Sequence, residues 1–211
     1  IVAKRGKMAC VSGLSDSFDE AYDAMTALRQ GGIGAEHLSL ITNNMVLQAN
    51  REAKLSTIRT SDASQSDAAA PLSPPSDSHA FEALGIMTLP GIGEVAAIGW
   101  ATAALVGVAG STQNATQPAS LVNTLQQNDV SERMAETYSE ALRRGSTLLL
   151  IRCAKAEIAQ VEALLDEWGS VKIDERRDAY VAEGWITFDR TMPALTFEEI
   201  ERDRRTRGLV R

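Results

Sequence analysis

Apolar positions follow two spacings along the chain, and together they predict a β–α–β unit near the start. Residues 7–14 and 38–42 are short apolar runs of the kind that form buried strands. Between them, apolar residues recur at helical spacing after Ser17 and stop at Gly31. A serine is a favoured N-cap and a glycine a favoured C-terminal stop, so this stretch is predicted to be a helix.

The same order returns near the other end of the chain. Residues 146–153 predict the clearest strand, a helix is expected from Ile158 to Trp168, and residues 170–174 alternate like a strand. Two β–α–β units of similar length indicate an α+β fold, specifically a split ferredoxin-like βαβ–βαβ sandwich. In that fold two helices cover one face of a four-stranded sheet, and the other face is left for another element to cover.

The stretch between the halves is too long to be an ordinary loop. Its first part is rich in serine, proline and aspartate and predicts a flexible linker. Its second part is rich in glycine and alanine, carries Glu94 as its one charged residue, and predicts an apolar helical hairpin. The expected organisation is a first βαβ half, the linker, the apolar helical insertion, a connecting helix with the second βαβ half, and a C-terminal tail, at residues 7–43, 44–82, 83–128, 129–176 and 177–211.

Three uses of the apolar insertion remain open on sequence grounds. It could be an interface between copies, an intrachain element that covers the open face of the sheet, or a membrane contact. Residues 95–110 are shorter than the roughly 20 apolar residues that a membrane span needs. If the insertion is an interface, the candidate contact residues are its large apolar side chains: Ile98, Trp100, Leu105, Val106 and Val108.

Composition narrows the chemistry. The formal net charge of −7 disfavours a nucleic-acid partner, which needs a clustered positive field. Only two histidines are present and neither has metal-ligand spacing, so no catalytic, cofactor-binding or metal-binding residue is predicted. Cys10 and Cys153 are expected to be reduced core thiols, which favours a reducing compartment. Glu94 has two interpretations, a buried proton or ion site and a carboxylate in a first helical turn.

Several segments resemble the bacterial heat-induced or general stress protein family. They include Leu-Pro-Gly-Ile-Gly at 89–93 with the Ala/Gly-rich segment after it, and Glu-Ala-Leu-Arg-Arg-Gly at 140–145 running into the strand at 147–151. Residues 11–24 and 173–185 look similar too, so the likeness spans about residues 8–185. The resemblance implies a small cytoplasmic protein with no known catalytic site. The sequence departs from the family at Glu94 and in the polar run at 111–117.

These observations predict a non-catalytic, stress-associated structural or interaction protein without a cofactor. It is expected to self-assemble, as a homo-oligomer, or to dock on a larger protein assembly through its apolar hairpin. Two alternatives remain, a peripheral subunit of a membrane-bound complex and a ligand-binding regulatory module. The expected location is the cytoplasm, with a membrane-peripheral position as the alternative.

Overall fold

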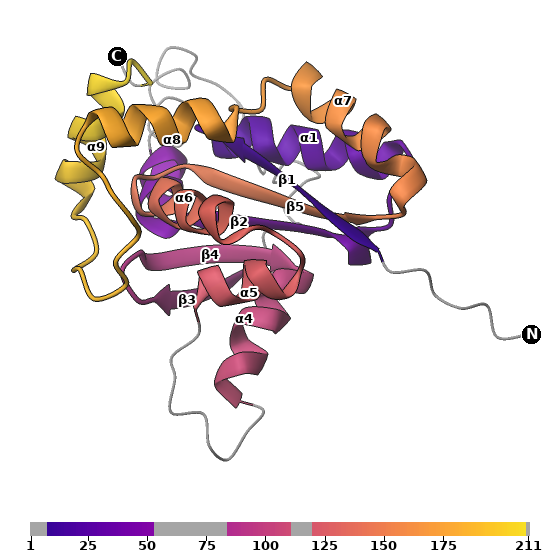
Figure 1. Cartoon of the computed structure of the whole chain (residues 1–211), viewed down its shortest axis with the longest axis horizontal. Helices are drawn as coiled ribbons and strands as arrows, with labels where there is room; N and C mark the ends of the chain where they lie inside the picture. Colours follow the sequence, from indigo (N-terminus) through magenta and orange to yellow (C-terminus); the bar gives the residue numbers. More distant parts are fainter. Residues whose placement is uncertain (1–7, 53–83, 111–119, 210–211) are drawn as a thin grey trace, which may run out of the picture.

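One five-stranded antiparallel sheet organises the molecule (Figure 1). The computed structural model describes residues 8–52, 84–110 and 120–209, without the side chains of 106–110. The strands lie in the order β1-β5-β2-β4-β3, and every neighbouring pair is antiparallel. Their bounds are β1 Ala9–Ser15, β2 Leu38–Asn43, β3 Gly85–Leu89, β4 Gly93–Gly99 and β5 Thr147–Cys153. The strands predicted at 7–14, 38–42 and 146–153 are confirmed.

The central strand β5 lies between the two strands of the first β–α–β unit. Because β1 and β2 are both antiparallel to β5, they run parallel to each other, and α1 (Phe18–Gln30) connects them. Ser17 caps α1 by accepting a hydrogen bond from the Glu20 amide at 3.4 Å, as its sequence predicts. All but one of the seven residues of β5 are buried, so this strand reads as one continuous apolar run.

The second β–α unit has no full strand after its helix. After β5, the short 3₁₀ helix Lys155–Glu157 leads into α7 (Ile158–Glu167), as predicted. The strand expected at 170–174 is wrong, because only Val171 pairs with β1, in an isolated bridge to Leu14. From Ile173 the chain instead forms α8 (Ile173–Ala182).

The predicted helical hairpin at 83–128 is also wrong in its first part, which forms the β3–β4 hairpin. Val95 and Ala97 face one core and Ala96 faces the other, so β4 is apolar on both sides. Such a doubly buried strand has no alternation that would distinguish it from a helix in sequence. Within the described part of the insertion, the helical segments are α4 (Trp100–Gly110) and α5 (Leu121–Gln127). A short 3₁₀ helix at Ala35–His37 leads into β2.

Two glycines explain how this hairpin turns. Gly91 lies at the β3–β4 turn with a positive φ of 77°, and a Cβ there would lie 2.7 Å from the Cα of Arg190. Gly99 ends β4 with φ 86°, where a Cβ would collide with the carbonyl oxygen of Leu38. A side chain at either position is excluded both by backbone conformation and by a packed neighbour.

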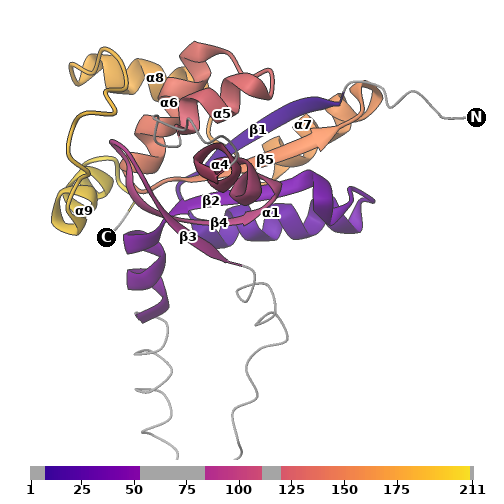
Figure 2. The ribbon, with the colours of Figure 1, turned by 90° about the horizontal axis from the view of Figure 1, so that it is seen from below.

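Helices cover both faces of the sheet, and two hydrophobic cores result (Figure 2). On one face, α1 and α7 pack over β1, β5 and β2 together with a helix at 44–52, whose Leu47 is buried. The part of the predicted linker at 44–52 is therefore helical, and the remainder lies outside the described residues.

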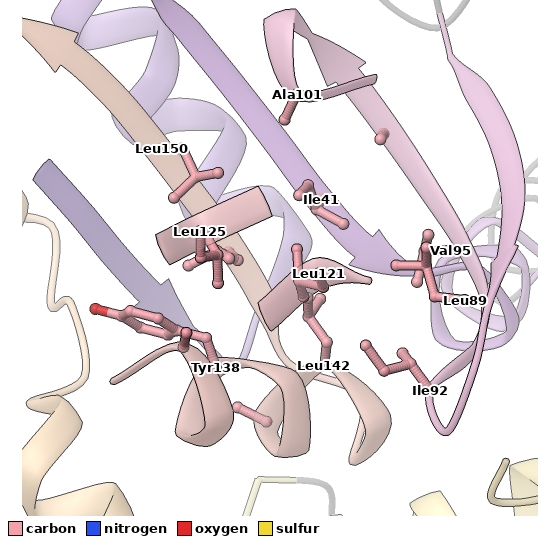
Figure 3. Packing of buried hydrophobic residues seen from close by; sticks show 14 of the residues in the cluster. Ile41, Leu89, Ile92, Val95, Ala101, Leu121, Leu125, Tyr138, Leu142 and Leu150 are labelled. Carbon is pink, nitrogen blue, oxygen red and sulfur yellow. The ribbon is translucent and has the colours of Figure 1, made fainter. Parts of the chain in front are cut away.

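The opposite face carries α5, α6 (Glu132–Arg143) and α8. Tyr138 and Leu142 of α6 point toward the sheet beside Leu121 and Leu125 of α5, as Figure 3 shows. The face that the sequence left open is thus covered within the chain by the insertion and the connecting helix.

Residues 177–211 are not a simple tail, because α8 and α9 (Phe197–Thr206) pack on the domain. Tyr180 and Ile200 are fully buried, and Arg204 is only 6% exposed. The mixed charges of α9 suggest a solvated face in sequence, but its Arg204 is buried against the distant carbonyl oxygens of Gly145 and Asp16. The tail prediction failed for this reason.

Candidate functional site

Of the predicted interface residues, the structure places Leu105 inside the intrachain core and Trp100 against it. Leu105 is completely buried, and Ile98 and Trp100 are half-buried. The Trp100 indole N–H donates to the carbonyl oxygen of His37 at 3.2 Å, and the Arg152 guanidinium stacks 3.6 Å from the centre of its ring. Val106 and Val108 belong to α4, but their side chains lie outside the described part of the structure.

Glu94 matches neither of its two interpretations. It lies in strand β4 instead of in a helical turn, and its side chain is exposed instead of buried. Its carboxylate accepts a hydrogen bond from the Asn44 amide nitrogen at 2.9 Å, which ties β4 to the helix at 44–52.

The two cysteines are free thiols on neighbouring strands. Cys153 belongs to the core under α1 and α7, whereas Cys10 packs against the core on the other face of the sheet. Side chains on opposite faces cannot form a disulfide without moving the backbone. Burial raises the pKa of Cys10 to about 11, although Arg152 acts in the opposite direction, so the thiol stays protonated at neutral pH.

Buried charge gathers at one end of the sheet, in a cluster that we call the arginine clasp: Asp16, Arg144, Arg176, Arg204 and Arg207. Arg176 of α8 forms a two-pronged ion pair with Asp16, which also accepts from the Ser146 hydroxyl at 2.8 Å. Arg204 of α9 donates to the carbonyl oxygens of Gly145 at 2.9 Å and Asp16 at 3.0 Å. These contacts bind both C-terminal helices to the loop between β1 and α1.

The outer part of the clasp is built around Tyr180. Arg144 donates to Glu140 at 2.7 Å and to Asp203 at 3.1 Å, and its guanidinium lies 4.2 Å from the centre of the Tyr180 ring. Arg207 pairs with Asp203 and donates to the Arg144 carbonyl oxygen at 3.2 Å. The four arginines of the clasp face four carboxylates, namely Asp16 and the adjoining Glu140, Glu183 and Asp203, so the chemistry of the clasp is that of a structural ion-pair network.

The pKa of Asp16 reflects this environment. Burial would raise it, but the hydrogen bond and charge of Arg176, with Ser146 and Arg207, hold the pKa below its ordinary value. Asp16 therefore remains ionised, which is the state that the clasp requires.

A second feature is the outer edge of β1. The Leu14 carbonyl oxygen accepts a hydrogen bond from the Val171 N–H at 2.7 Å, on the side of β1 that faces away from β5. The N–H and C=O groups of Leu14 therefore point away from the sheet. Because this orientation alternates along an antiparallel strand, the N–H and C=O groups of Ser12 and Cys10 point outward as well. Within the described residues, the edge of β1 is paired at Leu14 alone.

A groove of about 490 Å³ runs along this open edge, and we call it the β1 groove. One wall comes from α7, with Ile158, Glu162, Leu165 and Asp166. The other wall comes from α6 and the segment that enters α8, with Met134, Tyr138, Val171, Lys172 and Ile173. The floor is β1 itself, at Ala9, Cys10, Val11 and Ser12.

Polar contacts fix the wall on the α6 side. The Tyr138 hydroxyl lies 2.8 Å from the Ser12 hydroxyl, and burial raises the pKa of Tyr138 to about 12. Both groups are thus neutral hydrogen-bonding groups at physiological pH. Among the described residues, no imidazole lines the groove and neither hydroxyl is hydrogen-bonded to a carboxylate, so the arrangement suits binding better than proton transfer.

Sequence reasoning missed both the clasp and the groove. The groove exists because the stretch after α7 is too brief to fill the edge of β1, a fact that the alternating pattern at 170–174 concealed. The clasp joins residues from opposite ends of the chain, and no local pattern reports such pairing.

Comparison with known proteins adds no further constraint: the chain matches no family model, no curated protein and no solved structure. Among the described residues, no set of three or more His, Cys, Asp or Glu side chains is arranged to bind a metal ion. The described helices also include none with both the length and the apolar character that crossing a bilayer requires.

Proposed function

We propose that the protein is a non-catalytic interaction module that binds an extended segment of another protein along the open edge of β1. The observation that carries this proposal is the outward-facing backbone of Cys10 and Ser12, bordered by two helical walls. Edge strands with unpaired peptide groups accept an added strand, and side-chain pockets beside the edge provide selectivity.

The topology supports a split ferredoxin-like core for this module. Strand β5 lies between β1 and β2, as the third strand of that fold lies between its first two. The fourth strand of the fold would run beside β1, where this chain supplies only Val171. In this proposal the partner takes the place that the missing part of the fourth strand leaves free.

Self-assembly through the β3–β4 hairpin is the second candidate, because one large apolar side chain there faces solvent. Ile86 of the edge strand β3 is 57% exposed. The stress association expected from the family resemblance suits either candidate, since both describe a protein that acts by binding. The mass of the native protein in solution, compared with that of an Ile86→Lys variant, tests this candidate separately.

The test of the leading proposal uses two substitutions at one position. Cys10→Pro removes an N–H that points into the groove and leaves the pairing of β1 with β5 intact, since proline is tolerated where the N–H side of an edge strand faces solvent. Cys10→Ala removes the same thiol but keeps the N–H. A displayed library of random seven-residue peptides is selected against the wild-type protein.

We expect the selected peptides to bind the wild-type protein and the alanine variant and to lose binding to the proline variant. Equal binding to the proline variant would show that the edge of β1 is not the binding element. Thermal unfolding of both variants checks that each is folded at the temperature of the assay.

A further inference from the structure

The walls of the β1 groove restrict its occupant to a single strand. Ile158 and Leu165 line it from α7 on one face of the sheet, and Met134 and Ile173 line it from the other face. If two copies paired their β1 edges around a two-fold axis, α7 of each copy would lie on the same face and the two α7 walls would meet. An isolated extended segment brings no walls of its own and fits between them.

The length of the open edge sets the size of this segment. The unpaired part of β1 runs from Ala9 to Gly13, since Leu14 is already bridged to Val171. At about 3.4 Å per residue, it accommodates roughly five residues of an added strand. Cys10 and Ser12 supply the two outward-facing residues that can each exchange a pair of backbone hydrogen bonds with it.

The α7 wall has an acidic character. Glu162 forms no ion pair with any described residue, whereas Asp166 pairs with Lys172. Lys172 is the one cation in the lining, and its pKa is raised by the hydrogen bond and charge of Asp166, and then by Glu175 and Glu162. The lining thus holds two carboxylates, Glu162 and Asp166, against the one ammonium group of Lys172, which leaves a formal charge of −1 in the groove.

The opposite wall is apolar except for the Tyr138 hydroxyl and for Lys172, whose ammonium group pairs with Asp166 of the α7 wall. Met134, Val171 and Ile173 pack partly buried against the core that contains Tyr138. Successive side chains of an added strand point alternately to the two faces of the sheet. One set would meet the apolar wall and the other set would meet Glu162 and Asp166.

From this asymmetry we propose that the β1 groove recognises a basic, alternating segment of a partner protein, with aliphatic residues facing α6 and α8 and lysine or arginine facing α7. This inference rests on the proposed function, because it names the partner for the same edge. Charge complementarity decides the choice, since an acidic segment would bring its carboxylates against Glu162.

Two synthetic peptides provide the test. One is a capped seven-residue peptide of alternating valine and lysine, and the other replaces each lysine with glutamate. Their binding is measured by calorimetry at low and at physiological salt, and the amide resonances of Cys10 and Ser12 report where they bind. We expect the lysine peptide to bind at least about tenfold more tightly, with the preference reduced at higher salt.

Glu162→Lys is the charge variant, and Glu132→Lys on α6 is its matched control, because Glu132 does not line the groove. The first should reduce or reverse the preference for the lysine peptide, and the second should leave it unchanged. Cys10→Pro should abolish binding of the lysine peptide, and Cys10→Ala should preserve it.

The outcomes separate the inference from the proposed function. If the two designed peptides bind equally, or only the glutamate peptide binds, the charge inference is wrong while edge binding stands. If library peptides bind the wild-type protein but not Cys10→Pro, and the lysine peptide does not bind, the charge inference is wrong and the proposed function stands. If no peptide of any kind binds at β1, both fail.

Two other occupants would also overturn the inference. Residues 1–7 contain three basic side chains and precede β1 directly. If deleting them were required before any peptide bound, the occupant would be the chain itself. If Cys10→Pro converted a dimer of the wild-type protein into a monomer, the occupant would be a second copy.

Discussion

The two halves of the outer edge of β1 differ, although they belong to one strand. Near Leu14 the edge is closed by Val171, and the arginine clasp holds α8 and α9 over the loop that follows. Near Cys10 and Ser12 the edge faces a groove. The contrast shows that the segment before α8 closes one half of the edge at Val171 and, by turning into the helix at Ile173, leaves the other half open.

The ion pair between Asp16 and Arg176 explains why the chain leaves the sheet early. If the strand at Val171 continued to residue 174, it would pair with β1 as far as Val11 and would carry Arg176 away from Asp16. Helix α8 begins at Ile173 with Asp174 and Glu175 in its first turn, where carboxylates suit the helix dipole. The helix thus brings Arg176 to Asp16 and limits the pairing of this segment with β1 to one residue.

Breaking the closed half should have the largest effect. Asp16→Ala leaves Arg176, which is 9% exposed, without its carboxylate partner, and we expect a loss of about 3–5 kcal/mol in the free energy of unfolding. Denaturant unfolding followed by circular dichroism measures it. Arg205→Ala on the same helix as Arg204 is the control, because its side chain is 65% exposed and should contribute at most about 0.5 kcal/mol. A loss below about 1 kcal/mol for Asp16→Ala would show that the clasp does not hold the C-terminal helices.

Lowering the pH should reversibly reduce the stability that the arginine clasp provides in the same half. Because the pKa of Asp16 is lower in the folded state than its ordinary value of 3.8, its ionised form contributes stability that is present above pH 3.8. That contribution is lost as the pH falls from there through the folded-state pKa. We expect the unfolding free energy of the wild-type protein to fall more steeply below pH 4 than that of Asp16→Asn. Parallel curves for the two proteins would contradict this assignment.

A smaller effect is expected from the bridge at the boundary between the two halves. Val171→Pro removes the N–H that bonds the Leu14 carbonyl oxygen, and Leu14 is buried. The Val171→Ala variant keeps the N–H. We expect Val171→Pro to have an unfolding free energy about 1–3 kcal/mol lower than that of Val171→Ala. Hydrogen exchange of the backbone amide at position 171 should remain slow in the Val171→Ala variant. If proline and alanine have the same stability, the bridge is not a barrier at this boundary.

The smallest effect should come from the open half. Tyr138→Phe removes the hydroxyl that contacts Ser12 but leaves the buried ring in place, so we expect a loss of about 0.5–1.5 kcal/mol. Thermal unfolding measures the change, and Ser12→Ala should produce a similar loss if the hydroxyl pair is its cause. A double variant that loses no more than either single variant would identify the pair as one interaction.

Local patterns predicted the parts of the fold that depend on local physics. Ser17 and the glycines after α1 marked the ends of that helix, and the apolar run of β5 marked the most buried strand. The β3–β4 hairpin was mistaken for helices because Val95, Ala96 and Ala97 are all buried, which removes the period that separates strand from helix.

The candidate site depends on contacts that no local window contains. Arg176 lies 160 positions from Asp16, and Arg204 lies 188 positions from it. Sequence could predict that α9 is a charged helix but not that Arg204 is buried, because its partners are carbonyl oxygens of Asp16 and Gly145. The groove could not be predicted from the sequence for the same reason, since its walls come from α6 and α7 and only the fold brings them beside β1.

The distance along the chain between Asp16 and Arg176 also has a consequence during synthesis on the ribosome. At about 5–20 residues per second, roughly 10–30 s pass between the emergence of these two residues. During most of that time β5 has not been synthesised, so β1 lacks its partner strand, since Ala9 pairs with Cys153. The nascent chain therefore carries an unpaired β1 for most of its translation, and this is the period when a chaperone that holds extended segments would protect it best.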